Sequence, residues 1–519
     1  MKKNKLNNRL LIALLAVTVL ALGSCKKLDE QVYSSETSET FFKNSNQVVS
    51  AYLMPYSFMQ THIYQVHFAL QEFTSDEAVA PVRGGYVDQN GAWIRFHQHT
   101  WTSSEPWIET EWSNMFQAIG YCNSFIDAMK DRDLGSMNLP VSKEQMIAEV
   151  KMVRALHYYW ALSDFGNIPI AEHIGGQNPS TKTSAEVFAF IEKEIKDNLP
   201  SLGEKGDENW YGHFTKTAAH TLLAKLYLNA EVFTGTARWD DCIAECDSVI
   251  SSGKYRLDPK WSTPFLVNNE GSNENILVVP FDASRAPQFN AIQQQLHWDL
   301  ASKYNLNFAD GCWYKTVSDE SFYKKFKPND ARIKQWLVGP QSYTDENGEQ
   351  QPVLDEEGNQ LVLSAKIDKL FNTDGGWTDG AINIKYEIEE GGLDNMNNDL
   401  VIFRLADVMF MKAESIIRKN GNTATQLAVN LINTVRARSF SLNNPAAKYT
   451  TTTLTMEELL DERAREFAYE MFRREDLIRF GHFTDAWWEK AVSDKKYEIF
   501  PIPLNVLTAN PALKQNPGY

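Results

Sequence analysis

In the stretch 143-KEQMIAEVKMVRALHYYWALSDF-165, apolar side chains recur at alternating spacings of four and three residues. This spacing places them on one face of a helix. Gly166 and Pro169 follow and end the pattern. We therefore expect a helix over Lys143–Phe165 with a single apolar stripe that faces the core, formed by Met146, Val150, Val153, His157 and Trp160.

Similar helical patterns lie on both sides of this stretch. Short connections join several of them, and helices joined in this way pack as hairpins that stack like tetratricopeptide units. We therefore expect a mostly α fold with a tetratricopeptide-like scaffold of helical hairpins. Five helices are expected at Glu105–Lys130, Ser184–Leu199, Lys216–Ala230, Trp239–Ile250 and Met456–Phe480. Two more are indicated by their apolar faces. Ile402, Leu405, Met409, Ala413 and Ile416 form the face of the first, and Leu427, Leu431 and Val435 form the face of the second.

Two regions break the helical pattern. Ser75–Ser104 is rich in turn-forming residues, with aromatic side chains among them. Between Tyr255 and Asn398 the pattern is mixed, with a short strand expected at Ile276–Pro280 and a hairpin over Pro352–Leu363. Aromatic side chains among turn residues do not follow the periodicity of a core, and loops often carry function.

These loop aromatics are candidates for sugar binding. A flat Trp or Tyr can cover the apolar face of a sugar ring, while Arg, Asn and Asp bind its hydroxyls. The Arg83–Trp93 loop and the Trp298–Tyr314 segment supply these residue types. Packing under loops remains the alternative for such rings, and we prefer it for Trp101, Trp107 and Trp112. The candidate ligand-binding residues are Arg83, Asn90, Trp93, Trp298, Trp313 and Tyr314.

Acids and arginines crowd the predicted helix Met456–Phe480. Two carboxylates that face each other across a sugar would indicate a glycoside hydrolase. Here the acids alternate with arginines at three and four residues, the spacing of ion pairs within a helix. We interpret the set as scaffold: Glu462, Arg463, Glu466, Glu470, Arg473, Asp476 and Arg479.

The sequence contains none of the motifs G-x-S-x-G, HExxH, the P-loop or G-x-G-x-x-G. His97 and His99 share one side of an expected extended segment, but no further ligand lies at metal-binding spacing. Cys242 and Cys246 lie four apart on an expected helix, where packing is favoured over metal binding. We expect no catalytic residue, no metal site and no cofactor.

The charge balance limits the partners. The formal net charge is −16, and removal of the four basic residues before Leu10 brings it to −20. Such an acidic chain argues against nucleic acid, whose phosphates demand Lys and Arg. It also argues against charge-driven adhesion to anionic lipid. The five cysteines are too few for a disulfide framework in 519 residues.

The N-terminus has the features of a secretory signal peptide. Basic residues precede the apolar segment Leu10–Leu22, which is shorter than the roughly 20 residues of a membrane span. Leu22-Gly23-Ser24-Cys25 resembles a bacterial lipoprotein box, so we expect cleavage before Cys25 and lipidation of that residue. Stable anchoring needs at least two acyl chains. The alternative is an ordinary secretory signal with an accidental cysteine.

Five stretches resemble the SusD/RagB family of surface nutrient-binding lipoproteins, over essentially the whole chain. Each stretch alone is a modest match, but their order and spacing behind a lipoprotein signal are specific. The front segment Ser75–Trp101 also resembles one branch of the family. The five stretches are Arg154–Pro169 (RALHYYWALSDFGNIP), Phe403–Glu414 (FRLADVMFMKAE), Leu431–Arg438 (LINTVRAR), Glu462–Gly481 (ERAREFAYEMFRREDLIRFG) and Phe500–Tyr519 (FPIPLNVLTANPALKQNPGY).

The resemblance implies a tetratricopeptide-like helical scaffold with an irregular, loop-rich ligand-facing half and a few short strands. It implies a signal peptide at residues 1–24, an N-terminal region at 25–235 and a C-terminal region at 236–519, the last two in one compact unit. It implies a lipid anchor in the outer membrane that faces outward, with Asp29-Glu30 similar to an export signal. The family's ligand residues vary, so none is transferred by motif.

The resemblance also implies a partner, a SusC-like TonB-dependent transporter. We therefore expect a cell-surface lipoprotein, not an enzyme, that binds oligosaccharides and delivers them to this transporter for uptake. One alternative is a peptide-binding receptor of the same fold, since some members bind peptides. A surface glycoside hydrolase is the less favoured alternative.

Overall fold

The computed structural model describes residues 42–135, 137–208, 210–442 and 444–519. The predicted leader and Cys25 therefore lie outside the described residues. Val49–Tyr519 form one unit of structure, and the architecture below is that of this unit. Of Met1–Val48, the structure describes residues 42–48, which include the start of helix α2 (Ser45–His62).

Helix α6 spans Lys143–Phe165, as the sequence predicts. The Ser142 side chain caps it by accepting a hydrogen bond from the Gln145 backbone N–H, and Gly166, at φ 65°, ends it. The prediction of a single apolar stripe was too narrow, because every side chain from Met152 to Phe165 is buried. A helix buried on all sides lies inside the scaffold.

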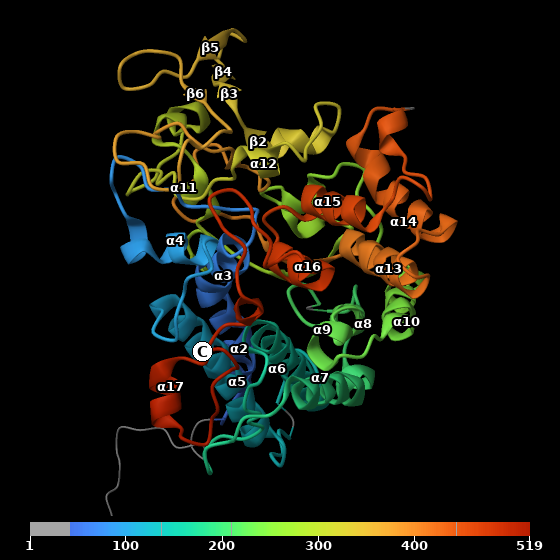
Figure 1. Cartoon of the computed structure of the whole chain (residues 1–519). Coiled ribbons are helices and arrows are strands. Elements are labelled where there is room, and N and C mark those ends of the chain that lie inside the picture. The colour runs from blue at the N-terminus through green and yellow to red at the C-terminus, as the bar shows by residue number, and fades with distance from the viewer. Residues whose placement is uncertain (1–41, 136, 209, 443) are drawn as a thin grey trace, which may run out of the picture. The chain divides into compact units, whose positions relative to one another are not determined.

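The long helices pack in succession (Figure 1). Helix α6 lies between α5 (Pro106–Met129) and α7 (Ser184–Asn198). Further along the chain, α8 (Lys216–Leu228) packs on α10 (Trp239–Ser251), α10 on α13 (Leu405–Lys419), and α13 on α14 (Gln426–Arg436). This succession confirms the predicted tetratricopeptide-like helical fold.

Side-chain caps define several helix starts. Thr183, Thr215 and Thr425 each accept a hydrogen bond from a backbone N–H of the first turn that follows, and Glu186 completes a capping box with Thr183. On α10, Cys242 and Cys246 are fully buried, in keeping with a packing role. The local sequence thus sets the helix ends, and packing of the apolar faces then orders the helices.

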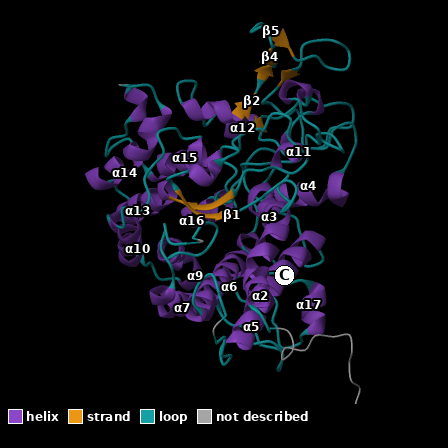
Figure 2. Ribbon diagram, turned by 180° about the vertical axis from the view of Figure 1, so that it is seen from behind, coloured by secondary structure: helices purple, strands orange, loops and turns teal. Residues whose placement is uncertain are grey.

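Within the described parts of the chain, the strands pair as four two-stranded antiparallel sheets. Figure 2 shows how short these strands are beside the helices. The longest pairs β1 (Asn275–Val279) with β8 (Leu400–Arg404), and all residues of both strands are buried. Ile402 therefore lies on a strand, whereas the sequence pattern placed it on the helix that follows; a short apolar run does not distinguish the two. The other pairs are β2 (Trp336–Leu337) with β7 (Ile382–Asn383), β3 (Gly339–Pro340) with β6 (Val362–Leu363), and β4 (Ser342–Thr344) with β5 (Gln350–Pro352).

The predicted helix Met456–Phe480 is two helices, α15 (Met456–Phe467) and α16 (Arg473–Phe480). Between them Tyr469 and Met471 adopt positive φ values of 59° and 65°. Buried carboxylates hold this break: Glu77 accepts the Tyr469 backbone N–H, and Glu72 accepts that of Met471 at 2.7 Å. These acceptors lie some 400 residues upstream, so the local pattern does not reveal the break.

Shorter helices complete the unit. The predicted irregular segment Ser75–Ser104 contains one of them, α4 (Ala92–His97), which carries Trp93 and His97, so this part of the prediction was wrong. Among the described residues, no helix combines the length and the apolar composition that crossing a bilayer requires. The shorter helices are α3 (Phe68–Phe73), α4 (Ala92–His97), α9 (Ala230–Thr234), α11 (Ala291–Gln295), α12 (Glu320–Tyr323) and α17 (Leu504–Ala509).

Candidate functional site

A pocket of about 650 Å³ lies among the loops of the irregular half. Three segments that are far apart in the sequence form it: residues 80–94, the region 298–315, and Trp377. Six aromatic side chains line it, as is typical of a ligand-binding cavity. The lining residues are Ala80, Pro81, Val82, Arg83, Tyr86, Asp88, Gln89, Trp93, Ile94, Trp298, Trp313, Tyr314, Lys315 and Trp377.

Arg83 joins the three segments. Its guanidinium donates hydrogen bonds to the main-chain carbonyls of Gly376 (2.9 Å), Tyr314 (2.7 Å) and Asp379 (2.8 Å). It also stacks on Tyr314, with the guanidinium carbon 4.0 Å from the ring centroid. The sequence predicts Arg83 as a partner for ligand hydroxyls. In the structure, these hydrogen bonds to main-chain carbonyls instead hold the backbone segments of the pocket together.

Trp298 lies in a 3₁₀ turn, Trp298–Leu300. The ring centroid of His297 lies 4.0 Å from that of Trp298, and Trp377 meets Trp298 edge to face at 5.9 Å. Burial lowers the pKa of His297 to about 4, so its imidazole is neutral near pH 7. Contacts with two neutral rings therefore hold the indole of Trp298 in place.

Trp313 and Tyr314 occupy opposite environments. Backbone hydrogen bonds from Trp313 to Gln293 (2.8 Å) and from Lys315 to Gln294 (2.7 Å) anchor the segment on α11. Trp313 is 44% exposed, whereas Tyr314 is buried and donates its hydroxyl to the Asp379 carbonyl at 2.7 Å. Trp313 thus presents an open ring face, and Tyr314 forms part of the wall.

Trp93 belongs to the wall rather than to an open platform. It is 3% exposed, and its ring packs against Phe73 and Trp107. Its indole N–H donates to the Asp88 carboxylate at 2.8 Å, and Asp88 also pairs with Lys315 at 2.7 Å. The predicted stacking of a ligand on Trp93 is therefore restricted to the small exposed part of its ring.

Asn90 is exposed and is not among the residues that line the pocket. Tyr86 and Trp377 do line it, with 71% and 48% of their surfaces exposed. Neither is among the site residues that the sequence predicts. The turn formers around Tyr86 were a usable signal, because Gly84, at φ 53°, brings its backbone so close to Trp377 that a Cβ there would lie 2.2 Å from the indole.

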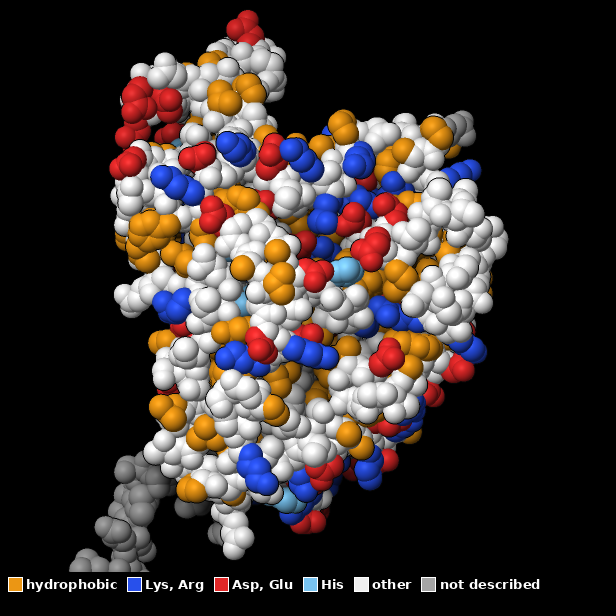
Figure 3. Space-filling view, in the orientation of Figure 1, with side chains coloured by type: hydrophobic (Ala, Val, Ile, Leu, Met, Phe, Trp, Pro, Cys, Tyr) orange, Lys and Arg blue, Asp and Glu red, His pale blue; other side chains and the backbone are white. Residues whose placement is uncertain are grey.

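Exposed aromatic side chains place the pocket at the surface. In Figure 3, hydrophobic side chains are visible along the left edge, in the region where Figure 1 labels α4 and α11. Tyr86, Trp313 and Trp377 are the exposed rings of the lining. Large exposed apolar rings around a cavity are typical of a ligand-binding site.

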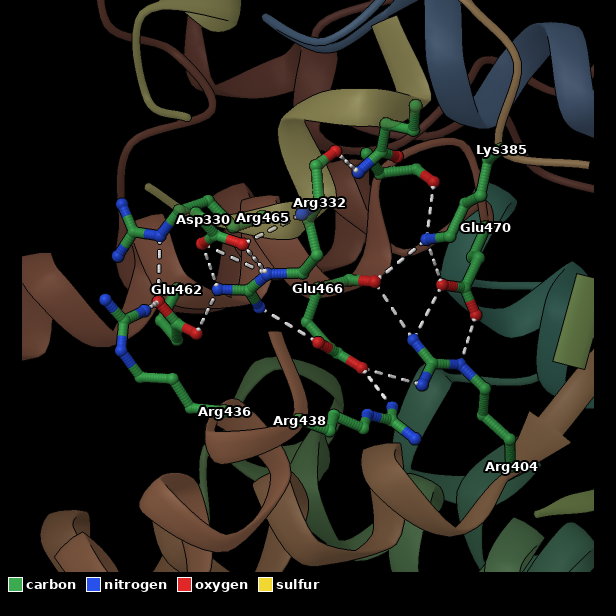
Figure 4. A network of polar contacts seen from close by, with 12 residues as sticks. Asp330, Arg332, Lys385, Arg404, Arg436, Arg438, Glu462, Arg465, Glu466 and Glu470 are labelled. Atoms are coloured by element: carbon green, nitrogen blue, oxygen red, sulfur yellow. Dashed lines mark hydrogen bonds and ion pairs between the residues drawn. The ribbon is translucent and has the colours of Figure 1, made fainter. Parts of the chain in front are cut away.

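Arginines surround the carboxylates of Glu462 and Glu466 on α15 (Figure 4). Glu462 is bonded by Arg332 at 2.8 Å, and Glu466 by Arg332, Arg404 and Arg438 at 2.9, 2.9 and 2.7 Å. Burial acts to raise the pKa of Glu466, and the three guanidiniums overcome this effect and lower it to about 2. A carboxylate held ionised in this way serves as scaffold rather than as a general acid.

The arginines of this network come mostly from other segments. Arg404 ends β8, Arg436 ends α14, and Arg332 lies between α12 and β2. The expectation of ion pairs within one helix was therefore wrong for Glu466, whose three arginines come from other segments. It holds for Glu462 with Arg465 at 2.8 Å within α15 and for Asp476 with Arg479 at 2.6 Å within α16. The network joins the helical and the irregular parts of the unit.

One group among the described residues has a composition that suits a metal ion. His67, Glu111 and Asp164 are buried, and their candidate ligand atoms lie within 4.8 Å of one another. However, Nδ1 of His67 is hydrogen bonded to Glu111 at 2.7 Å, and the guanidinium of Arg474 lies 3.5 Å from Asp164. Burial also raises the pKa of Glu111 to about 8. A cation at the group and a protonated carboxyl both disfavour a divalent ion.

The two histidines considered at the sequence level have other partners. His97 contacts the Trp488 carbonyl at 2.7 Å, and His99 contacts Ser493 and the Thr74 carbonyl at 2.9 Å each. His97 ends α4 and His99 has φ 52°, so the expected extended segment is not present. Both rings contribute to packing between distant segments.

The fold and the pocket together define a class of helical, tetratricopeptide-like proteins whose loops form an aromatic cavity. Two family sequence profiles match the chain in turn. The profile described as the SusD family matches residues 249–519, and the one described as starch-binding associating with outer membrane matches residues 26–228. The chain belongs to the SusD family.

Individual relatives agree with this assignment. The chain is 26% identical to the starch-binding protein SusD of Bacteroides thetaiotaomicron over 461 residues, which covers 81% of this chain and 80% of the relative. It is 24% identical to a SusD-like protein of Formosa agariphila, over 96% of this chain and 98% of the relative. Surface glycan-binding protein A of B. thetaiotaomicron, solved with laminarihexaose, has the same fold, with a TM-score of 0.72. The two sequences are 18% identical, and the match covers 91% of this chain and 99% of that protein.

Proposed function

We propose that this chain binds oligosaccharides in the aromatic pocket. The supporting observation is the set of three exposed rings, Tyr86, Trp313 and Trp377, around a cavity of about 650 Å³. Aromatic faces remove water from the C–H faces of sugar rings, and polar groups at the edge bind the hydroxyls. Asp88 and Gln89 lie in the lining and offer such groups.

Capture at this pocket requires no covalent step. The sugar stacks, exchanges a few hydrogen bonds with water, and leaves with its bonds intact. Reversible binding suits a protein that passes its ligand on, because a ligand held too tightly would not be released. We propose that the recipient is a SusC-like TonB-dependent transporter, as the family resemblance implies.

We further propose that the protein is an outer-membrane lipoprotein that faces outward and is anchored through Cys25. The apolar leader and Leu22-Gly23-Ser24-Cys25 support this, together with a family profile described as associating with the outer membrane. Replacement of Cys25 by Ala should move the protein from the membrane fraction to a soluble fraction. Retention of the C25A protein in the membrane fraction would contradict anchoring at this residue.

Calorimetry tests the binding proposal. The probes are glucose hexasaccharides with α-1,4, β-1,3 and β-1,4 linkages, and as competitors hexapeptides, which test the alternative of a peptide receptor. Trp313 is 44% exposed. Stacking on one face of its ring removes roughly 55 Å² of apolar surface, which at about 25 cal/mol/Å² corresponds to an affinity change of about tenfold.

We therefore expect Trp313→Ala and Trp377→Ala each to weaken binding of the same sugar by about tenfold. Tyr343→Ala is the matched control, because Tyr343 is 38% exposed on β4 and is not among the pocket's lining residues. If both tryptophan variants bind the sugar with unchanged affinity, the binding site lies elsewhere. Steady release of shortened sugars during the titration would instead support the hydrolase alternative.

A further inference from the structure

The charged side chains that line the pocket are bonded within the protein. Arg83 donates to three main-chain carbonyls, and Lys315 pairs with Asp88 at 2.7 Å. Asp88 uses the same oxygen, Oδ2, to accept the indole N–H of Trp93 at 2.8 Å. Gln89 also lines the pocket and is exposed, but its amide bonds none of the described residues. The Gln89 amide can therefore exchange its hydrogen bonds to water for bonds to a ligand.

The backbone at Gln89 has a conformation that glutamine rarely adopts. Gln89 lies at φ 48° and ψ 39°, and Asn90 lies at φ 52° and ψ 32°. Gly91 follows at φ 78°, so three consecutive residues are left-handed. Glycine adopts this conformation easily and asparagine tolerates it, whereas other residues do so at a cost in free energy. Residues held in such a conformation cluster at functional sites.

Contacts at both ends hold this left-handed turn. At its start, Asp88 is fixed by its two bonds within the pocket wall. At its end, Arg95 donates to the Asn90 carbonyl at 2.8 Å, and Glu105 accepts from the Arg95 guanidinium at 2.7 and 3.1 Å. A strained backbone persists only where its surroundings hold it firmly. The backbone at Gln89 is therefore set before a ligand arrives, which lowers the entropy cost of binding.

We propose that Gln89 determines the specificity of this pocket by bonding two adjacent hydroxyls of one sugar ring. The inference rests on the proposed function and adds to it the polar contact that selects the sugar. The carbonyl of a carboxamide accepts a hydrogen bond, and its NH₂ group donates one in the same plane. One of two adjacent hydroxyls donates to the carbonyl, and the other accepts from the NH₂ group.

The supply of adjacent hydroxyls depends on the linkage of the sugar. In a 1,4-linked glucose chain, every unit keeps its hydroxyls at C2 and C3. In a β-1,3-linked chain the C3 oxygen belongs to the linkage, so only the unit at the non-reducing end keeps this pair. Gln89 should therefore contribute more to the binding of the α-1,4 or β-1,4 hexasaccharide than to that of the β-1,3 hexasaccharide.

Two substitutions separate the amide from the backbone strain. Gln89→Ala removes the amide and leaves a residue that still disfavours positive φ, whereas Gln89→Gly removes both the amide and the strain. By calorimetry, each variant should bind a 1,4-linked hexasaccharide about tenfold more weakly, because two hydrogen bonds to the sugar are lost. The loss for the β-1,3 hexasaccharide should be smaller.

Asn90→Gly is the matched control. It makes the same backbone change one residue further along the turn, and Asn90 is not among the lining residues. This variant should bind the sugar with unchanged affinity. Both glycine variants should unfold at the Tm of the parent or above it, because glycine adopts a positive φ without strain. A loss of affinity without a loss of stability then distinguishes a binding role of Gln89 from a structural one.

The outcomes separate this inference from the proposed function. If the parent and Gln89→Ala bind the sugars equally well, the role of Gln89 is refuted while oligosaccharide binding stands. If Asn90→Gly weakens binding as much as Gln89→Gly does, the shape of the turn matters rather than the amide, and the inference fails.

The linkage comparison gives a further way to refute it. If only the β-1,3 hexasaccharide binds, or if Gln89→Ala weakens its binding as much as that of the 1,4-linked sugars, the contact with adjacent hydroxyls is refuted. If none of the three hexasaccharides binds the parent protein, both this inference and the proposed function are refuted.

Discussion

Replacement of Glu466 by Gln tests whether the buried ion network stabilises the fold. The Glu466 carboxylate accepts from three guanidiniums, those of Arg332, Arg404 and Arg438, and its side chain is 2% exposed. Removing one partner from a buried ion pair costs about 3–5 kcal/mol, because the remaining charge stays buried. The amide of Gln would also direct its own N–H groups at guanidinium donors.

The expected loss in the free energy of unfolding lies at the lower end of this range. Each of the three arginines keeps another carboxylate: Arg332 keeps Asp330, while Arg404 and Arg438 keep Glu274. We therefore expect a loss of about 3 kcal/mol in the free energy of unfolding. If the whole unit unfolds together, an unfolding entropy of about 2.1 cal/mol/K per residue gives a fall in Tm of about 3 °C.

Urea unfolding followed by tryptophan fluorescence and circular dichroism measures the loss. Glu457→Gln is the control, because the Glu457 side chain is 74% exposed and pairs with His482 at the surface. The control should change the free energy of unfolding by less than about 0.5 kcal/mol. If Glu466→Gln changes stability no more than the control does, the network is not a main source of stability.

The pH dependence adds a second check on Glu466. Its pKa in the folded protein, about 2, lies below the ordinary value of 4.5. Its contribution to stability is therefore fully present above pH 4.5 and is lost as the pH falls towards 2. The difference between the parent and Glu466→Gln should shrink over that interval, and a constant difference would refute the assignment.

Two further results are expected. Gly84→Ala places a Cβ 2.2 Å from the Trp377 indole at a residue with φ 53°, so it should displace Trp377. Sugar binding should weaken about as much as in Trp377→Ala. Unchanged affinity would show that Trp377 can shift without weakening sugar binding. Burial raises the pKa of Glu111 from 4.5 to about 8, so its neutral form stabilises the fold at low pH and the parent loses this stability as the pH rises from 4.5 to 8. Glu111→Gln should make this loss of stability smaller. Thermal unfolding at pH 5 and 9 measures the loss, and an equal loss in both proteins would contradict the prediction.

The sequence allowed the helices to be predicted because each carries its own periodicity and caps. Helix α6 illustrates both the success and the limit. Its bounds follow from Ser142 and Gly166, but the burial of every side chain from Met152 to Phe165 depends on neighbours on all sides, which a stripe of five residues does not reveal. The break between α15 and α16 shows the same limit, because Glu72 and Glu77 hold it from the other end of the chain.

For the candidate site, residue type was more informative than spacing. Five of the six selected residues line one pocket although they come from two distant regions of the chain: Arg83, Trp93, Trp298, Trp313 and Tyr314. Their individual environments were not predictable, because burial of Trp93 and the carbonyl contacts of Arg83 depend on tertiary packing. Trp377 was not selected because its place beside Trp298 depends on the path of a loop some 80 residues away.

Arg83 has a consequence for how such a pocket can evolve. It holds the walls through hydrogen bonds to main-chain oxygens of Gly376, Tyr314 and Asp379, and these bonds do not use the side chains of Tyr314 and Asp379. Its stacking on the Tyr314 ring is the one contact of the set that needs a particular side chain. A gene copy could exchange the neighbouring rings one codon at a time while the cavity keeps its outline. A change to a different ligand would then require few substitutions and no redesign of the backbone.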